Sequence, residues 1–139
     1  MAYETTDVPI SRSQEGIRQL VNSHKGAGIS FISQSPREGF EALVTLQEIS
    51  YHIRVMASCQ VKTKWTKEQE ERRVWRVLFY HLKGMFEAAD SGVIAVEDII
   101  LPYIVTPDNR TIAEHIRPKL AEARNLTGER LLTAGGFEK

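Results

Sequence analysis

The sequence contains a single cysteine, Cys59, among its 139 residues. One cysteine excludes an internal disulfide and a zinc site built from several cysteines, and it fits a reducing compartment. No apolar run approaches the roughly eighteen residues that a membrane-spanning helix needs, and the first residues contain no apolar core of a signal peptide. We therefore expect a cytoplasmic protein that makes no contact with a membrane.

The chain also lacks an excess of charge of either sign. Its 18 basic and 18 acidic residues cancel, so no field of the whole protein draws it toward phosphate groups or membranes. Any electrostatic binding surface must therefore be a local patch. A content of 42% hydrophobic and 26% charged residues is typical of a globular protein, and the length suggests one domain.

Motifs of the common catalytic chemistries are missing as well. The histidines show none of the spacings of a zinc site, and the sequence has no P-loop, no dinucleotide-binding fingerprint and no G-x-S-x-G elbow. His52 and Cys59 do not form a catalytic cysteine–histidine pair. On one strand they would point to opposite faces and lie roughly 20 Å apart. We predict a protein that is not an enzyme and that needs neither a cofactor nor a metal ion.

The pattern of apolar residues divides the chain into an irregular arm (1–10), one domain (11–125) and a mobile tail (126–139). The domain is predicted to open with a helix. Ser11 and Gln14 form a capping box, in which each side chain satisfies the other's free backbone N–H. Gly26 and Gly28 are expected to end this helix.

Three strands are predicted next, near residues 27–33, 40–47 and 49–57. Apolar and polar residues alternate in each, and the alternation changes phase across Gln47 and Glu48, as in a tight hairpin. One face of this sheet is expected to be exposed to solvent. Its polar residues are Glu41, Thr45, Ser50, His52 and Arg54.

The longest predicted helix covers residues 67–90. Thr66 and Gln69 form a second capping box before it, and Ser91 with Gly92 ends it. Spacings of three and four place one set of apolar residues on a single face, which predicts a central helix between the sheet and later helices. This set is Trp75, Leu78, Phe79, Leu82, Phe86 and Ala89.

Two shorter helices complete the predicted fold. The first lies near residues 95–104, and the second follows the turn "TPDN" and begins at a third capping box, Thr111 with Glu114. Pro118 is expected to kink or restart the second helix. The predicted class is α+β, with an N-terminal helix, a three-stranded antiparallel sheet, a long central helix and two short C-terminal helices.

The segment "KTKWTKEQEERRVWR", residues 62–76, is the strongest candidate for a binding surface. Six basic and three acidic residues give it a net charge of +3 in a neutral chain. Trp65 precedes the helix and is expected to be exposed, whereas Trp75 falls on the core face. The candidate contact residues for DNA, RNA or another partner are Lys62, Lys64, Trp65, Arg72, Arg73, Arg76 and Lys83.

The pattern of this segment is also typical of the start of an ordinary solvent-exposed helix. Glu68 can pair with Arg72 and Glu70 with Arg73, each pair contributing roughly 0.2–0.5 kcal/mol. Acidic residues in the first turn occupy the end of the helix that would otherwise attract a phosphate. A solvated helix face, a nucleic-acid surface and a surface for an acidic protein partner all remain open.

The order helix, three strands, helix over residues 11–90 resembles the double-stranded RNA-binding domain. That resemblance implies contact with RNA phosphates through lysines on the first turn of the second helix. Here Lys67 is followed by Glu68, Gln69, Glu70 and Glu71, which departs from the pattern.

Three longer stretches resemble a group of small proteins of unknown function from tailed bacteriophages and prophages. They are "MAYETTDVPISRSQEGIRQLVNSHKGAG", "RRVWRVLFYHLKGMFEAADSGV" and "ILPYIVTPDNRTIAEHIRPKLAEA", which cover about half the chain in the same order. Members of this group have a glycine where Asn109 stands, which suits a left-handed turn residue. The resemblance implies a phage protein in the cytoplasm of the infected bacterial host.

Together these observations predict a non-enzymatic phage accessory protein that acts by binding. The first expected partner is nucleic acid in phage DNA metabolism. The alternatives are an inhibitor or adaptor that binds a host protein, such as a defence component, and a virion or assembly protein.

Overall fold

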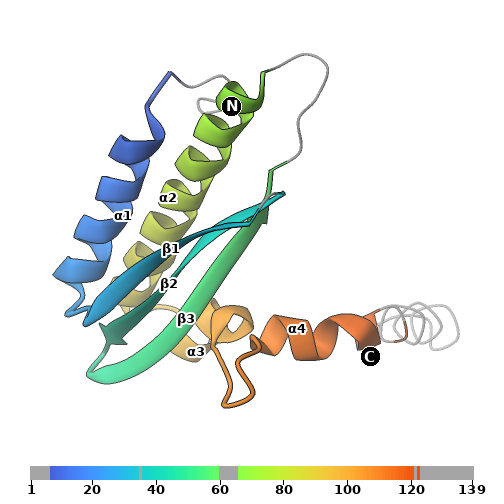
Figure 1. Ribbon diagram of the computed structural model, residues 1–139. Coiled ribbons are helices and arrows are strands. Elements are labelled where there is room, and N and C mark those ends of the chain that lie inside the picture. Colours follow the sequence, from blue (N-terminus) through green and yellow to red (C-terminus); the bar gives the residue numbers. More distant parts are fainter. Residues whose placement is uncertain (1–6, 35, 60–65, 121, 123–139) are drawn as a thin grey trace, which may run out of the picture.

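The structure is a computed structural model that describes residues 7–34, 36–59, 66–120 and 122. Three strands form one antiparallel sheet in chain order, and α1 and α2 lie side by side on one face of it (Figure 1). The predicted α+β class is therefore confirmed. The elements are α1 (Ile10–Ser23), β1 (Gly28–Gln34), β2 (Arg37–Leu46), β3 (Ile49–Ser58), α2 (Lys67–Ser91), α3 (Val96–Ile100), the 3-10 turn η1 (Leu101–Tyr103), α4 (Ile112–Ile116) and the 3-10 turn η2 (Arg117–Lys119).

The core lies between the sheet and the two long helices. Apart from a partly buried Phe79, the predicted apolar face of α2 is inside: Trp75, Leu78, Leu82, Phe86 and Ala89 are each at most 3% exposed. Alternate residues of β2 face these side chains, as the period of two requires. Burying one large apolar side chain contributes about 1.5–3 kcal/mol, so this layer accounts for most of the stabilising contacts.

The ends of α2 and the hairpin between β2 and β3 follow the prediction. Thr66 and Gln69 form the capping box, and Gly92 ends α2 with a φ of 74°. Gln47 and Glu48 have φ values of 50° and 70°. Two successive left-handed residues make the turn whose twist matches that of the strands it joins, so the observed hairpin is as tight as expected.

The predicted start of α1 is wrong. The helix begins at Ile10 with Pro9 as its N-cap, and no side chain caps it. The carbonyl of Pro9 accepts hydrogen bonds from the N–H groups of Arg12 at 3.1 Å and Ser13 at 3.3 Å. Proline has a fixed φ that suits a helix entry, so the helix starts before the Ser11 box can form.

The end of α1 also differs from the prediction. The helix stops at Ser23, and Lys25, with a φ of 55°, takes the left-handed position expected of a glycine. Gly26 is needed for a different reason, because a Cβ there would lie 2.2 Å from Cγ1 of Val21.

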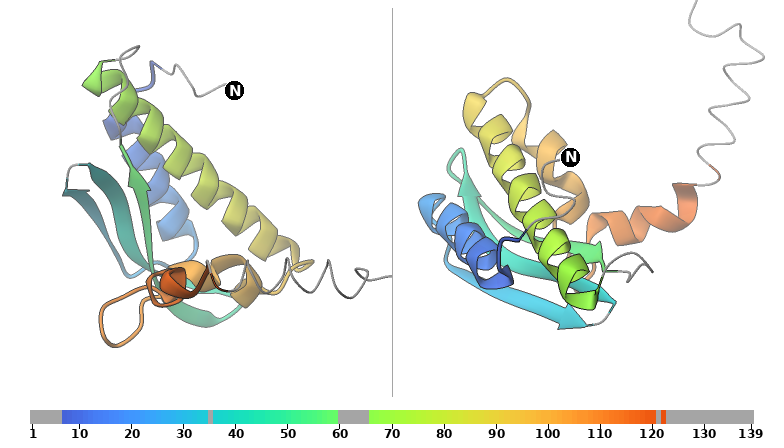
Figure 2. Two further views of the ribbon diagram at one scale, coloured as in Figure 1. Left: turned by 90° about the vertical axis from the view of Figure 1, so that its right-hand side faces the viewer. Right: turned by 90° about the horizontal axis from the view of Figure 1, so that it is seen from above.

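The C-terminal segment runs along the outer edge of β3. The predicted helix near 95–104 is divided into α3 and η1, because Pro102 lacks the N–H that would continue α3. Beyond η1, Ile104 pairs antiparallel with Ile53 of β3. α4 then extends away from the two-layer body (Figures 1 and 2), and η2, which contains Pro118, replaces its continuation as predicted. No described helix combines the length and apolar character needed to cross a bilayer.

Candidate functional site

A tight turn between Thr106 and Thr111 joins the outer edge of β3 to α4. The N–H of Asn109 donates to the carbonyl of Thr106 at 2.9 Å, and Asn109 has a φ of 66°. The turn expected from "TPDN", with a left-handed residue at Asn109, is therefore present. The single hydroxyl proton of Thr106 lies within hydrogen-bond reach of both Asp108 and the carbonyl of Arg110, which closes the turn from inside.

The start of α4 is fixed by the predicted capping box. Oγ1 of Thr111 accepts the N–H of Glu114 at 3.2 Å, and Oε1 of Glu114 accepts the N–H of Thr111 at 2.8 Å. This bond to the Thr111 backbone is the main reason that the pKa of Glu114 lies below its ordinary value. A side-chain cap of this kind stabilises a helix by about 0.5–2 kcal/mol, which is substantial for a helix as short as α4.

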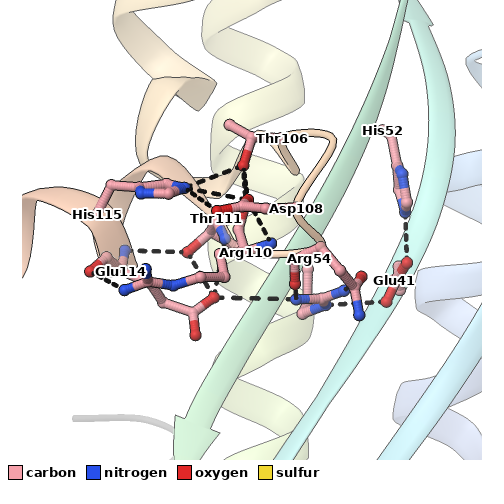
Figure 3. Close-up of polar contacts among 10 residues, drawn as sticks. Glu41, His52, Arg54, Thr106, Asp108, Arg110, Thr111, Glu114 and His115 are labelled. Atoms are coloured by element: carbon pink, nitrogen blue, oxygen red, sulfur yellow. Dashed lines mark hydrogen bonds and ion pairs between the residues drawn. The ribbon is translucent and has the colours of Figure 1, made fainter.

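Arg54 of β3 ties this turn to the outer face of the sheet (Figure 3). Its Nε donates to Glu41 of β2 at 2.9 Å. Its Nη1 donates to the carbonyl of Asn109 at 3.0 Å and its Nη2 to Oδ1 of the same residue at 2.6 Å. Oε1 of Glu114 lies 3.9 Å from Nη1. One guanidinium therefore connects two strands, the turn and the first turn of α4.

Glu41 completes this arrangement by also accepting a hydrogen bond from His52. Burial alone raises the pKa of Glu41, but the hydrogen bonds and charges of Arg54 and His52 outweigh it and leave the pKa below its ordinary value. Glu41 is thus held in its charged form. We call Glu41, His52, Arg54, Asn109 and Glu114 the sheet–turn network.

A second polar group in Figure 3 invites comparison with a catalytic triad. His115 approaches both Thr106 and Asp108, but through the same ring nitrogen, Nε2, at 3.1 Å from each. A hydroxyl–imidazole–carboxylate relay needs a different ring nitrogen for each partner. These three side chains therefore brace the turn, and the hydrogen bond from Thr106, with that of His115, lowers the pKa of Asp108.

The 3-10 turns η1 and η2, together with α4 and Leu120, line an apolar hollow of about 270 Å³. Leu101, Ile116 and Leu120 on its walls remain 44%, 47% and 40% exposed. Single exposed apolar side chains are normal on a protein surface, whereas several around one depression indicate an interaction site. We call this feature the C-terminal hollow; it is lined by Leu101, Pro102, Ile112, Ala113, Ile116, Arg117 and Leu120.

The predicted basic surface is only partly described, because Lys62, Lys64 and Trp65 lie outside the described residues. Arg73 forms the predicted pair with Glu70, whose side chain is buried, through two hydrogen bonds of 3.0 Å. The predicted pair of Glu68 with Arg72 does not form within the described part of the chain.

The other described candidate residues of this segment and α2, namely Arg72, Arg76 and Lys83, differ in their surroundings. Nε of Arg72 is buried and has no hydrogen-bond partner among the described residues. The guanidinium of Arg76 lies over the rings of Phe79 and Tyr80, at 4.8 and 5.0 Å from their centroids. Lys83 is exposed. The structure therefore does not gather the three arginines into one freely exposed cationic surface.

The aromatic assignment within the same segment is confirmed for Trp75. Its side chain is 1% exposed, and its indole N–H donates to the buried carboxylate of Glu38 at 3.0 Å. Trp75 is thus a core residue and no stacking platform. Among the described residues, no group of three histidine, cysteine or acidic side chains is arranged to hold a metal ion.

Sequence reasoning missed the C-terminal hollow, although a signal for it exists. Ile112, Ile116 and Leu120 recur at intervals of four, which is the spacing of one helix face. The contact between Arg54 and Asn109 has no such signal, because it joins residues 55 positions apart.

Comparison with known proteins adds no relative, since no family model, no curated protein and no solved structure matches this chain.

Proposed function

We propose that this protein acts by binding another protein, without catalysis, and that the C-terminal hollow receives an amphipathic helix of that partner. The observation that carries the proposal is the group of half-exposed apolar side chains around one depression. Apolar surface gains about 25 cal/mol per Å² when it leaves water, so covering the hollow stabilises a complex.

The lining of the hollow defines the chemistry of the partner. Its walls are almost wholly apolar, which suits the leucine-like or aromatic anchors that a helix presents at spacings of three and four. Arg117 also lines the hollow, and Lys119, two residues later, is exposed. An acidic residue beside the anchors would therefore be favoured over a basic one.

The sheet–turn network gives the hollow a fixed position. Without it, the turn and α4 would be held to the sheet edge mainly by the backbone contacts around Ile104. A preformed site loses less conformational entropy when it binds, so the network supports affinity without touching the partner.

The resemblance to phage proteins supports a setting for this proposal. In the cytoplasm of an infected bacterium the partner would be a host protein that is inhibited or recruited, such as a defence component, or another phage protein during assembly.

The test uses a display library of helical peptides selected on the full-length immobilised protein. We expect enriched peptides with apolar residues at spacings of three and four and an acidic residue beside them. Fluorescence polarisation with a selected peptide should show binding that Ile116→Glu removes. Ile49→Glu is the matched control, because Ile49 is 51% exposed against 47% for Ile116 but lies at the β2–β3 hairpin. Peptides that bind both variants equally would refute the assignment.

Nucleic acid is the second candidate, and the order of elements supports it. Two helices on one face of a three-stranded antiparallel sheet is the arrangement of the double-stranded RNA-binding domain, and Lys83 is exposed on α2. The ion pair of Arg73 with Glu70 and the acidic first turn weigh against it.

This second candidate predicts salt-dependent binding of labelled DNA or RNA duplexes and single strands, because neutralised phosphates release counterions. Lys83→Glu should weaken that binding more than Arg12→Glu, which makes the same charge change on α1. No polarisation change at low salt would exclude nucleic acid as the partner.

A further inference from the structure

The two edges of the sheet differ in how they are covered. Along β3, the backbone of the C-terminal segment reaches the edge: Ile104 pairs with Ile53, and the N–H of Val105 donates to the carbonyl of His52 at 2.9 Å. β1 is the other edge, and among the described residues β2 is its one strand neighbour. Half of the backbone N–H and C=O groups of an edge strand point away from the sheet, so within the described part of the chain β1 offers a row of unused pairing groups.

β1 also lacks the features that normally prevent an edge from pairing. Its seven residues, GISFISQ, include no charged side chain and no proline. Natural edge strands are commonly protected by lysine, proline, a bulge or an inward-pointing charge. The neighbouring strands do carry charges, such as Arg37 and Glu41 on β2 and Arg54 on β3. The absence of protection is therefore specific to the free edge.

We propose that β1 pairs antiparallel with β1 of a second copy of this chain, which joins the two sheets into one across a twofold axis. This inference is independent of the proposed function, because β1 takes no part in the C-terminal hollow.

Side-chain geometry favours a second copy as the occupant of this edge. In a twofold pairing, residues of equal parity lie opposite each other, so Ile29 and Phe31 continue the inner, apolar layer of both sheets. Ser30 and Ile32 continue the outer face. Beside them lies a hollow of about 360 Å³ that is partly lined by Ile32 and Leu43, and the copy's Ile32 would extend this apolar surface.

The charged side chain next to β1 is already paired within one copy. Arg18 of α1 lies over the ring of Phe31, at 5.1 Å from its centroid, and pairs with Glu15 at 3.4 Å. Arg18 is thus balanced by Glu15 of the same helix and adds no unpaired charge beside the edge. Because β1 itself carries no charge, no like charges face each other directly across the paired strands.

The test is the mass of the full-length protein in solution, by sedimentation equilibrium over a range of concentrations. We expect a reversible dimer of twice the 15.8 kDa chain mass at concentrations on the order of 100 μM, with dissociation on dilution. Ser30→Lys places a charge on the edge and should weaken dimerisation at least about tenfold. Ser50→Lys is the matched control, because it makes the same change on the outer face of β3 and should leave the dimer intact.

Hydrogen exchange provides a second readout that does not depend on a variant. Alternate amides of β1 should exchange more slowly at high than at low protein concentration, while those of β3 should not change. A protein that stays monomeric throughout this range overturns the proposal. So does a dimer that Ser30→Lys leaves unchanged, or one in which the concentration-dependent protection falls outside β1.

Discussion

Arg54→Ala removes the centre of the sheet–turn network and is the sharpest perturbation of the structure that positions the C-terminal hollow. The side chain of Arg54 is 15% exposed and makes three hydrogen bonds of 2.6 to 3.0 Å, one to Glu41 and two to Asn109. Alanine removes all three bonds and leaves Glu41 partly buried with His52 as its one remaining partner in the network.

The expected loss follows from the kinds of bond that are broken. A hydrogen bond between neutral groups contributes about 0.5–1.5 kcal/mol net, and one that involves a charge about 1.5–3 kcal/mol. All three bonds involve the guanidinium, but water reaches its exposed edge and replaces part of each. We therefore expect Arg54→Ala to lower the free energy of unfolding by about 2–3 kcal/mol.

Urea denaturation followed by tryptophan fluorescence measures this loss, and hydrogen exchange locates it. Amides of the Thr106–Thr111 turn and of α4 should lose protection more than those of α2, because Arg54 holds the former and not the latter. Arg18→Ala is the control: Arg18 is 46% exposed and pairs with an exposed glutamate, so its loss should stay below about 1 kcal/mol. A loss from Arg54→Ala below 1 kcal/mol, or uniform deprotection of the whole fold, would refute this account of the network.

Three further outcomes check separate parts of the structure. Leu82→Ala should cost about 2–5 kcal/mol in thermal or urea unfolding, because Leu82 is fully buried in the core; a cost below 1 kcal/mol would contradict its central place. Thr66→Ala should cost about 0.5–2 kcal/mol by removing the cap of α2, whereas Thr66→Ser should cost little because it keeps the hydroxyl. The stability difference between the wild type and Glu41→Gln should be full above pH 4.5 and shrink as the pH falls below it, because a carboxylate whose pKa is lowered by folding stabilises only while it is charged; a difference that grows in acid would reverse the sign of that pKa shift.

The parts of the fold that were predictable from the sequence are those fixed by local interactions. The capping boxes at Thr66 and Thr111 each need two residues three positions apart, and the hairpin at Gln47 needs only a change of phase in the alternation. The face of α2 follows from helical spacing alone. α1 shows the limit of such signals. The sequence offers two possible starts for this helix, a capping box at Ser11 and an N-cap at Pro9, and the helix begins after Pro9.

The candidate site was harder to predict because long-range contacts build it. The three arginines of α2 look like one cationic surface in the sequence. In the structure Arg73 pairs with buried Glu70, Arg76 lies over the ring of Phe79, and the Nε atom of Arg72 is buried. The charge pattern of the sequence does not indicate any of these three environments. The contact of Arg54 with the turn likewise requires that β3 and the C-terminal segment lie side by side. No local sequence pattern predicts that arrangement.

We propose the C-terminal hollow as the surface with which this protein binds its partner. The most direct measurement is a hydrogen-exchange footprint of the full-length protein with and without a helical peptide obtained by selection on that protein. We expect that amides of residues 112–120 gain protection when the peptide binds, and that this gain disappears in Ile116→Glu but persists in Ile49→Glu. Protection confined to residues 66–83, with no change at α4, would contradict the claim and move the binding surface to the basic segment.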